Sequence, residues 1–126
     1  VLLINKYSAS DGDLFPWSFK ANKIGKVIGT RTWGGIIGIS GPLPYMDGTD
    51  VRVPFFTNYD AKTGQWIVEN HGVDPDILID NDPVKEQLGE DQQLNKAIEV
   101  ILQELKDRKP LPPVPAPRTY KDLGVE

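Results

Sequence analysis

The order of apolar and polar positions predicts a mixed α/β fold that begins with a strand, a helix and a second strand. Residues 1–5 open with an uninterrupted apolar run, which is typical of a short buried strand. Residues 12–22 repeat apolar side chains with helical spacing, although Pro16 fits only near the start of that helix. Residues 26–30 form a second predicted strand around the apolar pair Val27 and Ile28. A strand, a helix and a strand in about thirty residues make a crossover unit, so we expect the two strands to pair in parallel.

The middle of the chain predicts short extended segments separated by turns. A Gly-rich turn at residues 31–35 comes first, a loop follows at residues 42–48, and residues 58–64 suit the turn of a hairpin. Residues 70–83 are rich in Asp and Pro, and we expect them to be irregular. We expect extended backbone at residues 36–39, 50–56 and 65–69.

The last part of the chain predicts an amphipathic helix and a Pro-rich tail. Residues 91–109 carry the clearest helical pattern, with Asp91 placed to cap the start and Pro110 to end the helix. Residues 110–117 favour polyproline II or a disordered tether, and their P-x-x-P spacing also suits an SH3-type ligand. The apolar residues with helical spacing are Leu94, Ala97, Ile98, Ile101, Leu102 and Leu105.

Composition narrows the class of protein. The chain has 126 residues, a net charge of −4 and no Cys, which suits one domain at most. Without a basic stripe we expect no nucleic-acid partner. Without an apolar stretch near the roughly 18 residues of a membrane helix we expect a soluble protein with no membrane partner. The lack of Cys excludes disulfides and thiolate catalysis and is compatible with the cytoplasm or the periplasm. The chain starts without Met inside an apolar strand, so we expect a fragment of a larger protein.

The turn between the first strand and the first helix carries the strongest candidate chemistry. Ser10 lies there, directly before Asp11 and the start of the helix. A hydroxyl at such a turn is suited to nucleophilic attack, because the helix N-terminus offers backbone N–H groups to a developing oxyanion. Ser and Asp are also the favoured residues of an ordinary helix N-cap. The local sequence leaves both interpretations open.

A nucleophilic serine needs a base, and the chain offers two kinds. His71 is the only His, and it either completes a triad with Ser10 or lies in an exposed loop. A lysine can also activate a serine, but Lys23 and Lys26 are placed as solvated charges beside a turn.

The sequence does not contain a recognisable calcium-binding loop or phosphate-binding loop. The acidic residues Asp74, Asp76, Asp80 and Asp82 lack the central Gly and terminal Glu of a calcium loop, so a rigid surface loop is favoured. No Lys-Ser or Lys-Thr pair follows the Gly34-Gly35 pair, which excludes a P-loop. We therefore expect no metal and no cofactor.

Three ordered motifs resemble the tricorn protease branch of the S41 (tail-specific, or C-terminal processing) serine peptidases. They are NKYSASDGDLFP at residues 5–16, GKVIGTRTWGG at residues 25–35 and ENHGVDPD at residues 69–76. The resemblance extends over residues 1–105 and leaves out the tail.

The resemblance implies a fold of which this chain is only a part. The family has an α/β spiral similar to ClpP and crotonase, whose catalytic domain begins well before the nucleophile strand. Residues 1–109 would be the C-terminal portion of that domain, and residues 110–126 the Pro-rich tail. The missing half would carry the base, a His.

The resemblance also assigns roles to residues. Ser10 matches the nucleophile, the backbone N–H of Asp11 would stabilise the oxyanion, and Glu69 matches the acid that orients the catalytic residues through a Ser and a His. In the processing-protease branch a Lys base falls at the position of Gly35, so this chain favours the Ser–His–Ser–Glu type. His71 then lies where the family does not place its base. We expect substrate contacts at Trp33, Gly34, Gly35 and Ile36.

The function implied is that of a serine peptidase, an endopeptidase or oligopeptidase acting on peptides or unfolded polypeptides. We expect the chain alone to be inactive, to associate with the remainder of its catalytic domain, and to belong to an oligomer. The alternative is a non-catalytic crotonase-like scaffold or binding domain that keeps the turn. A third interpretation is a recognition module that acts through its Pro-rich tail.

Overall fold

The centre of the protein is a three-stranded parallel sheet. The computed structural model describes residues 1–40 and 44–124, so the loop expected at residues 42–48 lies partly outside the described residues. The sheet has the order β1-β2-β7, formed by β1 (Leu2–Ile4), β2 (Val27–Gly29) and β7 (Ile77–Leu78). Strands β1 and β2 pair in parallel with Leu3 opposite Ile28. This pairing confirms the predicted crossover.

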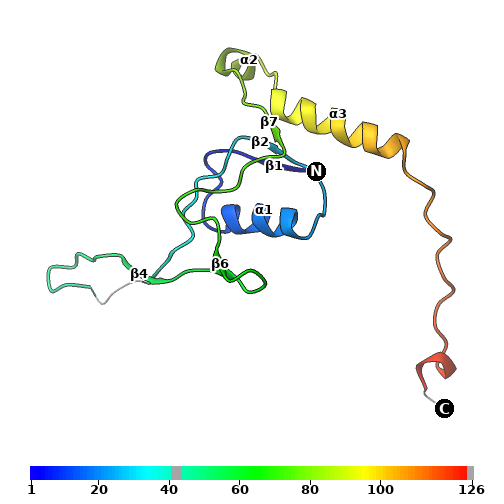
Figure 1. Cartoon of the computed structure of the whole chain (residues 1–126), viewed down its shortest axis with the longest axis horizontal. Coiled ribbons are helices and arrows are strands. Elements are labelled where there is room, and N and C mark those ends of the chain that lie inside the picture. Colours follow the sequence, from blue (N-terminus) through cyan, green and yellow to red (C-terminus); the bar gives the residue numbers. More distant parts are fainter. Residues whose placement is uncertain (41–43, 125–126) are drawn as a thin grey trace.

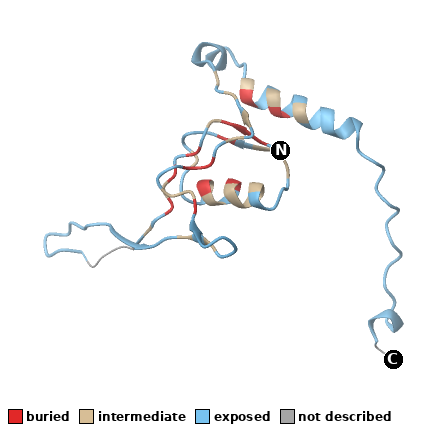
Figure 2. Ribbon diagram, viewed as in Figure 1, coloured by how far each residue is buried: buried red, intermediate tan, exposed pale blue. Residues whose placement is uncertain are grey.

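Two helices enclose the sheet. Helix α1 (Asp11–Ala21) joins β1 to β2, and helix α3 (Gln92–Lys106) packs against both of these strands. Figure 1 shows α1 and α3 on opposite sides of the strands. The side chains between them form the core, in which Val27 and Ile28 are fully buried and Ile4 is nearly so. Figure 2 shows how small this buried centre is beside the exposed remainder.

Strand β7 and helix α2 (Pro83–Gln87) lie in or next to the region that the sequence predicted to be irregular. Strand β7 joins the sheet because Asp76 clamps it to β2. The Asp76 carboxylate accepts the Val27 N–H at 2.8 Å, and the Asp76 N–H donates to the Val27 carbonyl at 2.7 Å. The prediction was wrong for these residues because a two-residue strand has no periodicity to detect.

Helix α1 occupies nearly the predicted residues but holds its proline further inside. Pro16 lies in the second turn of the helix rather than in the first. Its side chain is buried, and burial of this apolar ring offsets the backbone hydrogen bond that proline cannot donate.

Two antiparallel hairpins extend away from the sheet (Figure 1). Strands β3 (Gly38–Ser40) and β4 (Val53–Phe56) form the first, in which all four residues of β4 are exposed. Strands β5 (Tyr59–Asp60) and β6 (Gln65–Trp66) form the second, at the place where the sequence predicted a hairpin.

Helix α3 begins as predicted and ends three residues early. The Asp91 carboxylate caps it by accepting the Leu94 N–H at 2.9 Å. Gln93 and Ala97 are buried against the sheet. The chain then leaves the domain in an extended conformation, and only a 3₁₀ turn at Lys121–Leu123 interrupts it (Figure 1). None of the helices in residues 1–40 and 44–124 combines the length and the apolarity that a membrane span requires.

Candidate active site

The turn at Ser10 has a strained backbone. Ser10 is the N-cap of α1 and has φ 57° and ψ −113°, a conformation that residues other than glycine rarely adopt. Its carbonyl accepts the N–H groups of Asp13 at 2.8 Å and Leu14 at 3.0 Å, which fixes the start of the helix. Ser10 itself is exposed. The turn therefore presents a serine to solvent directly above the first turn of a helix, and strain of this kind is concentrated at functional sites.

Asp11 opens helix α1 beside this serine. As the first helical residue, its N–H has no intrahelical acceptor. The N-terminus of a helix is the positive end of the helix dipole, so this N–H is suited to bind a negatively charged oxygen. This is the donor to which the family resemblance assigned the oxyanion.

Asp13 ties the serine turn to the Gly-Gly segment. Its side chain is completely buried. One carboxylate oxygen, Oδ1, accepts the Gly34 N–H at 2.8 Å, and the other, Oδ2, accepts the N–H groups of Ser10 at 3.0 Å and Gly35 at 3.2 Å. The sequence analysis did not single out this residue. Its signal was an acidic residue three positions after the N-cap Ser, the spacing of a capping box.

Glu69 holds the next part of the same segment. Its Oε2 accepts the N–H groups of Ile36 at 2.7 Å and Ile37 at 3.0 Å. The neighbours of Glu69 on both sides have positive φ angles, 64° at Val68 and 61° at Asn70. A β-branched residue such as Val is a genuine outlier in this region, so the carboxylate sits on a strained loop.

The segment 34–37 is thus held between two carboxylates. Its four consecutive N–H groups are taken in pairs, the first pair by Asp13 and the second by Glu69. The Gly34 carbonyl accepts the Asn70 N–H at 2.7 Å. Gly34 has φ 88°, and a Cβ there would collide with the backbone of Gly72. The structure therefore brings the serine turn, the Gly-Gly segment and the Glu69 loop together.

The space beside Gly35 is filled by an indole ring. A Cβ at position 35 would fall within the ring of Trp33. Trp33 is otherwise 67% exposed, and its N–H donates to the Ser8 carbonyl at 2.9 Å. A lysine at position 35 would have to displace this ring, which agrees with the absence of a Ser–Lys arrangement at that position.

His71 is engaged away from the serine. Its ring is exposed, and Nε2 lies 2.7 Å from Oδ2 of Asp74. Within residues 1–40 and 44–124 no hydrogen bond joins His71 to Ser10. The structure does not assemble the triad that the sequence allowed within this chain.

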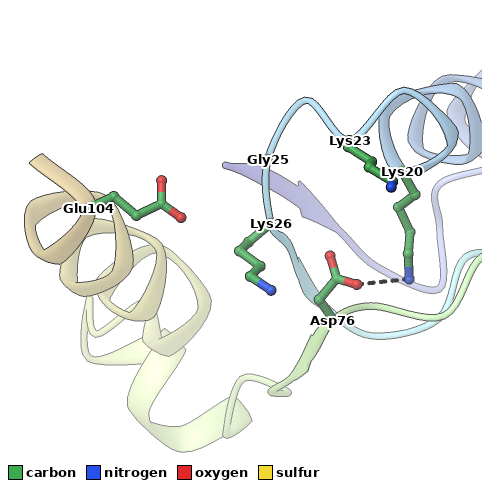
Figure 3. A pocket seen from close by; sticks show the side chains of 6 residues that line it. All are labelled: Lys20, Lys23, Gly25, Lys26, Asp76 and Glu104. Atoms are coloured by element: carbon green, nitrogen blue, oxygen red, sulfur yellow. Dashed lines mark ion pairs between the residues drawn. The ribbon is translucent and has the colours of Figure 1, made fainter. Parts of the chain in front are cut away.

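The candidate lysines lie at the other end of the sheet. Lys23 and Lys26 line a cavity of about 300 Å³ together with Lys20, Asp76 and Glu104 (Figure 3). This cavity adjoins the start of β2, whereas Ser10 follows the end of β1. Since β1 and β2 are parallel, the lysines and the serine belong to opposite ends of the strands. Neither lysine is placed to act as a base for Ser10.

The four acidic residues from the loop have separate partners. Asp76 bonds to the Val27 N–H and pairs with Lys20 at 3.1 Å. Partial desolvation raises the pKa of Asp76, but the hydrogen bond and the ammonium outweigh it, so the pKa lies below its ordinary value of 3.8. Asp82 caps α2, and Asp80 accepts the Asn81 N–H. In the described part of the chain no three acidic or His side chains gather as metal ligands would.

Comparisons with known proteins identify relatives of this chain. The family model described as peptidase family S41 matches residues 1–79, the range that contains all three motifs. The tricorn protease of Thermoplasma volcanium is 43% identical over 109 residues, which are 86% of this chain and 10% of that protein. Tricorn protease homolog 1 of Streptomyces coelicolor is 42% identical over 107 residues, 85% of this chain and 10% of its own length.

A solved structure agrees with these relatives. The crystal structure of the tricorn protease matches with a TM-score of 0.74 and 42% identity, over 82% of this chain and 10% of that one. These matches confirm the resemblance that the three motifs indicated. The chain spans about a tenth of the length of the relatives it matches.

Proposed function

The chain belongs to peptidase family S41, and we propose that it supplies the nucleophile and the orienting acid of a tricorn-like serine peptidase. The observation that carries this proposal is the strained, exposed Ser10 at the N-terminus of α1, joined through segment 34–37 to the carboxylate of Glu69. The substrate class is peptides or unfolded polypeptides.

The first chemical step is attack by Ser10 on the scissile carbonyl. The Oγ forms a bond to the carbonyl carbon while its proton passes to a His base in the preceding half of the domain. The carbonyl oxygen becomes an oxyanion that accepts the Asp11 N–H. A donor of this kind stabilises the transition state by about 3–4 kcal/mol. The protonated base then gives its proton to the leaving amine, and water hydrolyses the acyl-enzyme.

Glu69 orients that base. Its Oε2 is fixed by the Ile36 and Ile37 N–H groups, which sets the plane of the carboxylate. In the described residues no hydrogen bond reaches Oε1. This second oxygen is the acceptor that we assign to the Ser–His pair of the preceding half.

Substrate binding uses the side of this segment that is not already occupied. The N–H groups of Gly34, Gly35 and Ile36 are taken by carboxylates. The Gly34 carbonyl accepts the Asn70 N–H, so we assign backbone contacts with a peptide to the carbonyls of Gly35 and Ile36. The exposed indole of Trp33 lines the cleft. Among the described strands β3 pairs with β4 alone, and its second edge is suited to an extended peptide that adds as a strand.

The complete catalytic domain is a ClpP/crotonase-like spiral, of which residues 1–109 form the C-terminal portion and residues 110–126 the Pro-rich tail. The layers of α1, sheet and α3 support this assignment, as does the likeness to the tricorn protease structure. The chain alone is inactive because it lacks the base. It associates with the remainder of the domain within an oligomer.

Labelling with a fluorophosphonate probe tests the nucleophile. The probe is applied to the full-length protein and to this chain alone, and the adduct is mapped by mass spectrometry. We expect an adduct on Ser10 in the full-length protein only, lost in Ser10→Ala together with all peptidase activity. The matched control is Ser8→Ala, two residues away, which keeps the label.

The other outcomes are equally informative. Peptidase activity that survives Ser10→Ala contradicts the assignment of the nucleophile. Labelling of the isolated chain would show that it contains its own base and would return His71 to consideration. No labelling of the full-length protein would favour a non-catalytic scaffold.

A further inference from the structure

We propose that Asp13 is a positioning residue that holds Ser10 in its reactive conformation and at a fixed place relative to Glu69. This inference rests on the proposed function of Ser10 as the nucleophile. It concerns a buried carboxylate that the mechanism above does not use.

Asp13 joins backbone groups from two distant parts of the chain. Its carboxylate contacts the Ser10 N–H within the same turn and the N–H groups of Gly34 and Gly35, which are 21 and 22 residues away along the chain. An ordinary helix cap needs only the first of these contacts. The other two link the nucleophile turn to a different part of the fold.

Glu69 binds the same segment as Asp13. Asp13 takes the first two of four consecutive N–H groups and Glu69 takes the last two. Residues 34–37 therefore fix the position of the nucleophile turn and that of the acid. A shift of this segment would move the two groups relative to each other, and a displacement of about 1 Å at a reacting centre can lower a rate about 100-fold.

The strained backbone of Ser10 needs contacts that hold it in place. A φ of 57° persists at a non-glycine residue only where the surroundings enforce it. The Ser10 N–H is held by Asp13 Oδ2 while the Ser10 carbonyl accepts two N–H groups of α1. Because Asp13 is completely buried, water has no access to replace this contact.

A carboxylate is required at this position. Both of its oxygens face donors, and an amide has only one oxygen to offer. Asn at position 13 can keep the Ser10 and Gly35 contacts only by turning its NH₂ group toward the Gly34 N–H. The reverse orientation of the amide keeps the contact with the Gly34 N–H but turns the NH₂ group toward the N–H groups of Ser10 and Gly35. Asp13→Asn thus removes at least one of the three hydrogen bonds while it preserves the size of the side chain.

The test uses the full-length protein and measures how fast and how completely the fluorophosphonate probe labels Ser10. The rate constant reports the reactivity of each competent molecule, whereas the final amount of label reports how many molecules are folded. For Asp13→Asn we expect the labelling rate constant and kcat to fall by about 10- to 100-fold, with KM changed much less.

A merely structural role gives a different result. It would lower the final amount of label and the Tm while the rate constant stays at the wild-type value. The matched control is Asp76→Asn, which alters another carboxylate bonded to a backbone N–H, at the opposite end of the sheet. We expect it to lower the Tm and leave the rate constant within about twofold, because distant sites are independent.

A second variant decides the matter if Asp13→Asn does not fold. Asp13→Glu keeps the charge and both acceptors but lengthens the tether by one methylene, and we expect a rate constant at least about tenfold below wild type. Wild-type rate constants in a folded Asp13→Asn or Asp13→Glu protein overturn the proposal for Asp13 alone. Failure of the wild-type protein to label at Ser10 overturns the proposed function as well.

Discussion

Around the serine turn and the Glu69 loop, five residues have positive φ angles, and three of them are not glycine. These three are Ser10, Val68 and Asn70, and the two glycines are Gly34 and Gly72, whose backbones lie so close that a Cβ on Gly34 would collide with Gly72. Strain of about 1–3 kcal/mol at each such residue persists only where other contacts enforce it. Here Asp13 holds the Ser10 N–H, and the Gly34 carbonyl accepts the Asn70 N–H. The Val68 carbonyl accepts the N–H groups of His71 and Gly72. At the scale of residues, the site is recognised by its backbone as much as by its side chains.

Glu69 lets its two roles be separated by substitution. Glu69→Gln keeps an oxygen that can accept the Ile36 and Ile37 N–H groups but removes the charge that would orient a His. We expect kcat of the full-length protein to fall by about 100-fold or more, with a Tm close to wild type.

Glu69→Ala is the companion variant, because it removes both roles and should also lower the Tm. Wild-type kcat in Glu69→Gln would show that Glu69 only holds the backbone. Steady-state kinetics and thermal unfolding of the two variants distinguish these cases.

At the scale of elements, the third strand of the sheet depends on one side chain more than on its own sequence. Strand β7 has two residues, and its residue Leu78 is exposed. Asp76 joins it to β2 and, through Lys20, to α1. A short strand of this kind is stable only because the neighbouring sheet and helix already exist, so its place is decided by tertiary contacts.

The contacts of the Asp76 carboxylate with Lys20 and the Val27 N–H predict that stability depends on pH. The pKa of Asp76 is below its ordinary value of 3.8 in the folded protein, so the unfolded chain takes up a proton first as the pH falls. The contribution of Asp76 to stability is therefore complete above pH 3.8 and is lost as the pH falls through the folded pKa. We expect the Tm difference between wild type and Asp76→Ala to be constant from about pH 5 to 7 and to shrink below about pH 4.

Thermal unfolding of both proteins across this pH range checks the prediction. A difference that is unchanged at pH 3, or that grows there, would show that the ion pair with Lys20 does not hold the Asp76 charge as described.

At the scale of the whole molecule, the chain has a small core and a large exposed apolar surface. Helix α3 buries Gln93 and Ala97 against the sheet, while five of its large apolar side chains stay between 39% and 54% exposed. These side chains are Leu94, Ile98, Ile101, Leu102 and Leu105. A surface of this kind is typical of an interface, and the chain corresponds to about a tenth of its relatives' length.

The Pro-rich tail contributes nothing to this core. Every described residue from Pro110 onward is exposed. We therefore expect deletion of residues 110–126 to change the Tm by less than about 1 °C, as measured by differential scanning fluorimetry. Truncation after Ile101, which removes part of α3, is the comparison and should lower the Tm clearly. A large loss of stability on deletion of the tail alone would show that it docks on the domain, and loss of partner binding would favour the recognition module.

Much of this arrangement was predictable from local pattern. The apolar runs of β1 and β2, the crossover helix between them and the capped helix α3 are encoded by periodicity and by capping residues that lie within each element. The serine turn was also predictable, because its residue types and its place before a helix are local features. The exclusion of a lysine base at Gly35 came from the family resemblance, because only the resemblance places a lysine base at that position.

Other features were decided only by the tertiary structure. Asp13 and Glu69 reach backbone N–H groups that are 21 to 33 residues away, and no periodicity encodes which N–H a carboxylate will meet. The positive φ of Val68 contradicts its local preference and persists because surrounding contacts enforce it. The sequence by itself determined strands β1 and β2, helices α1 and α3 and the candidate nucleophile, because these depend on neighbouring residues. The tertiary structure decided how two carboxylates connect the nucleophile turn to the rest of the site, because those contacts exist only after distant segments meet.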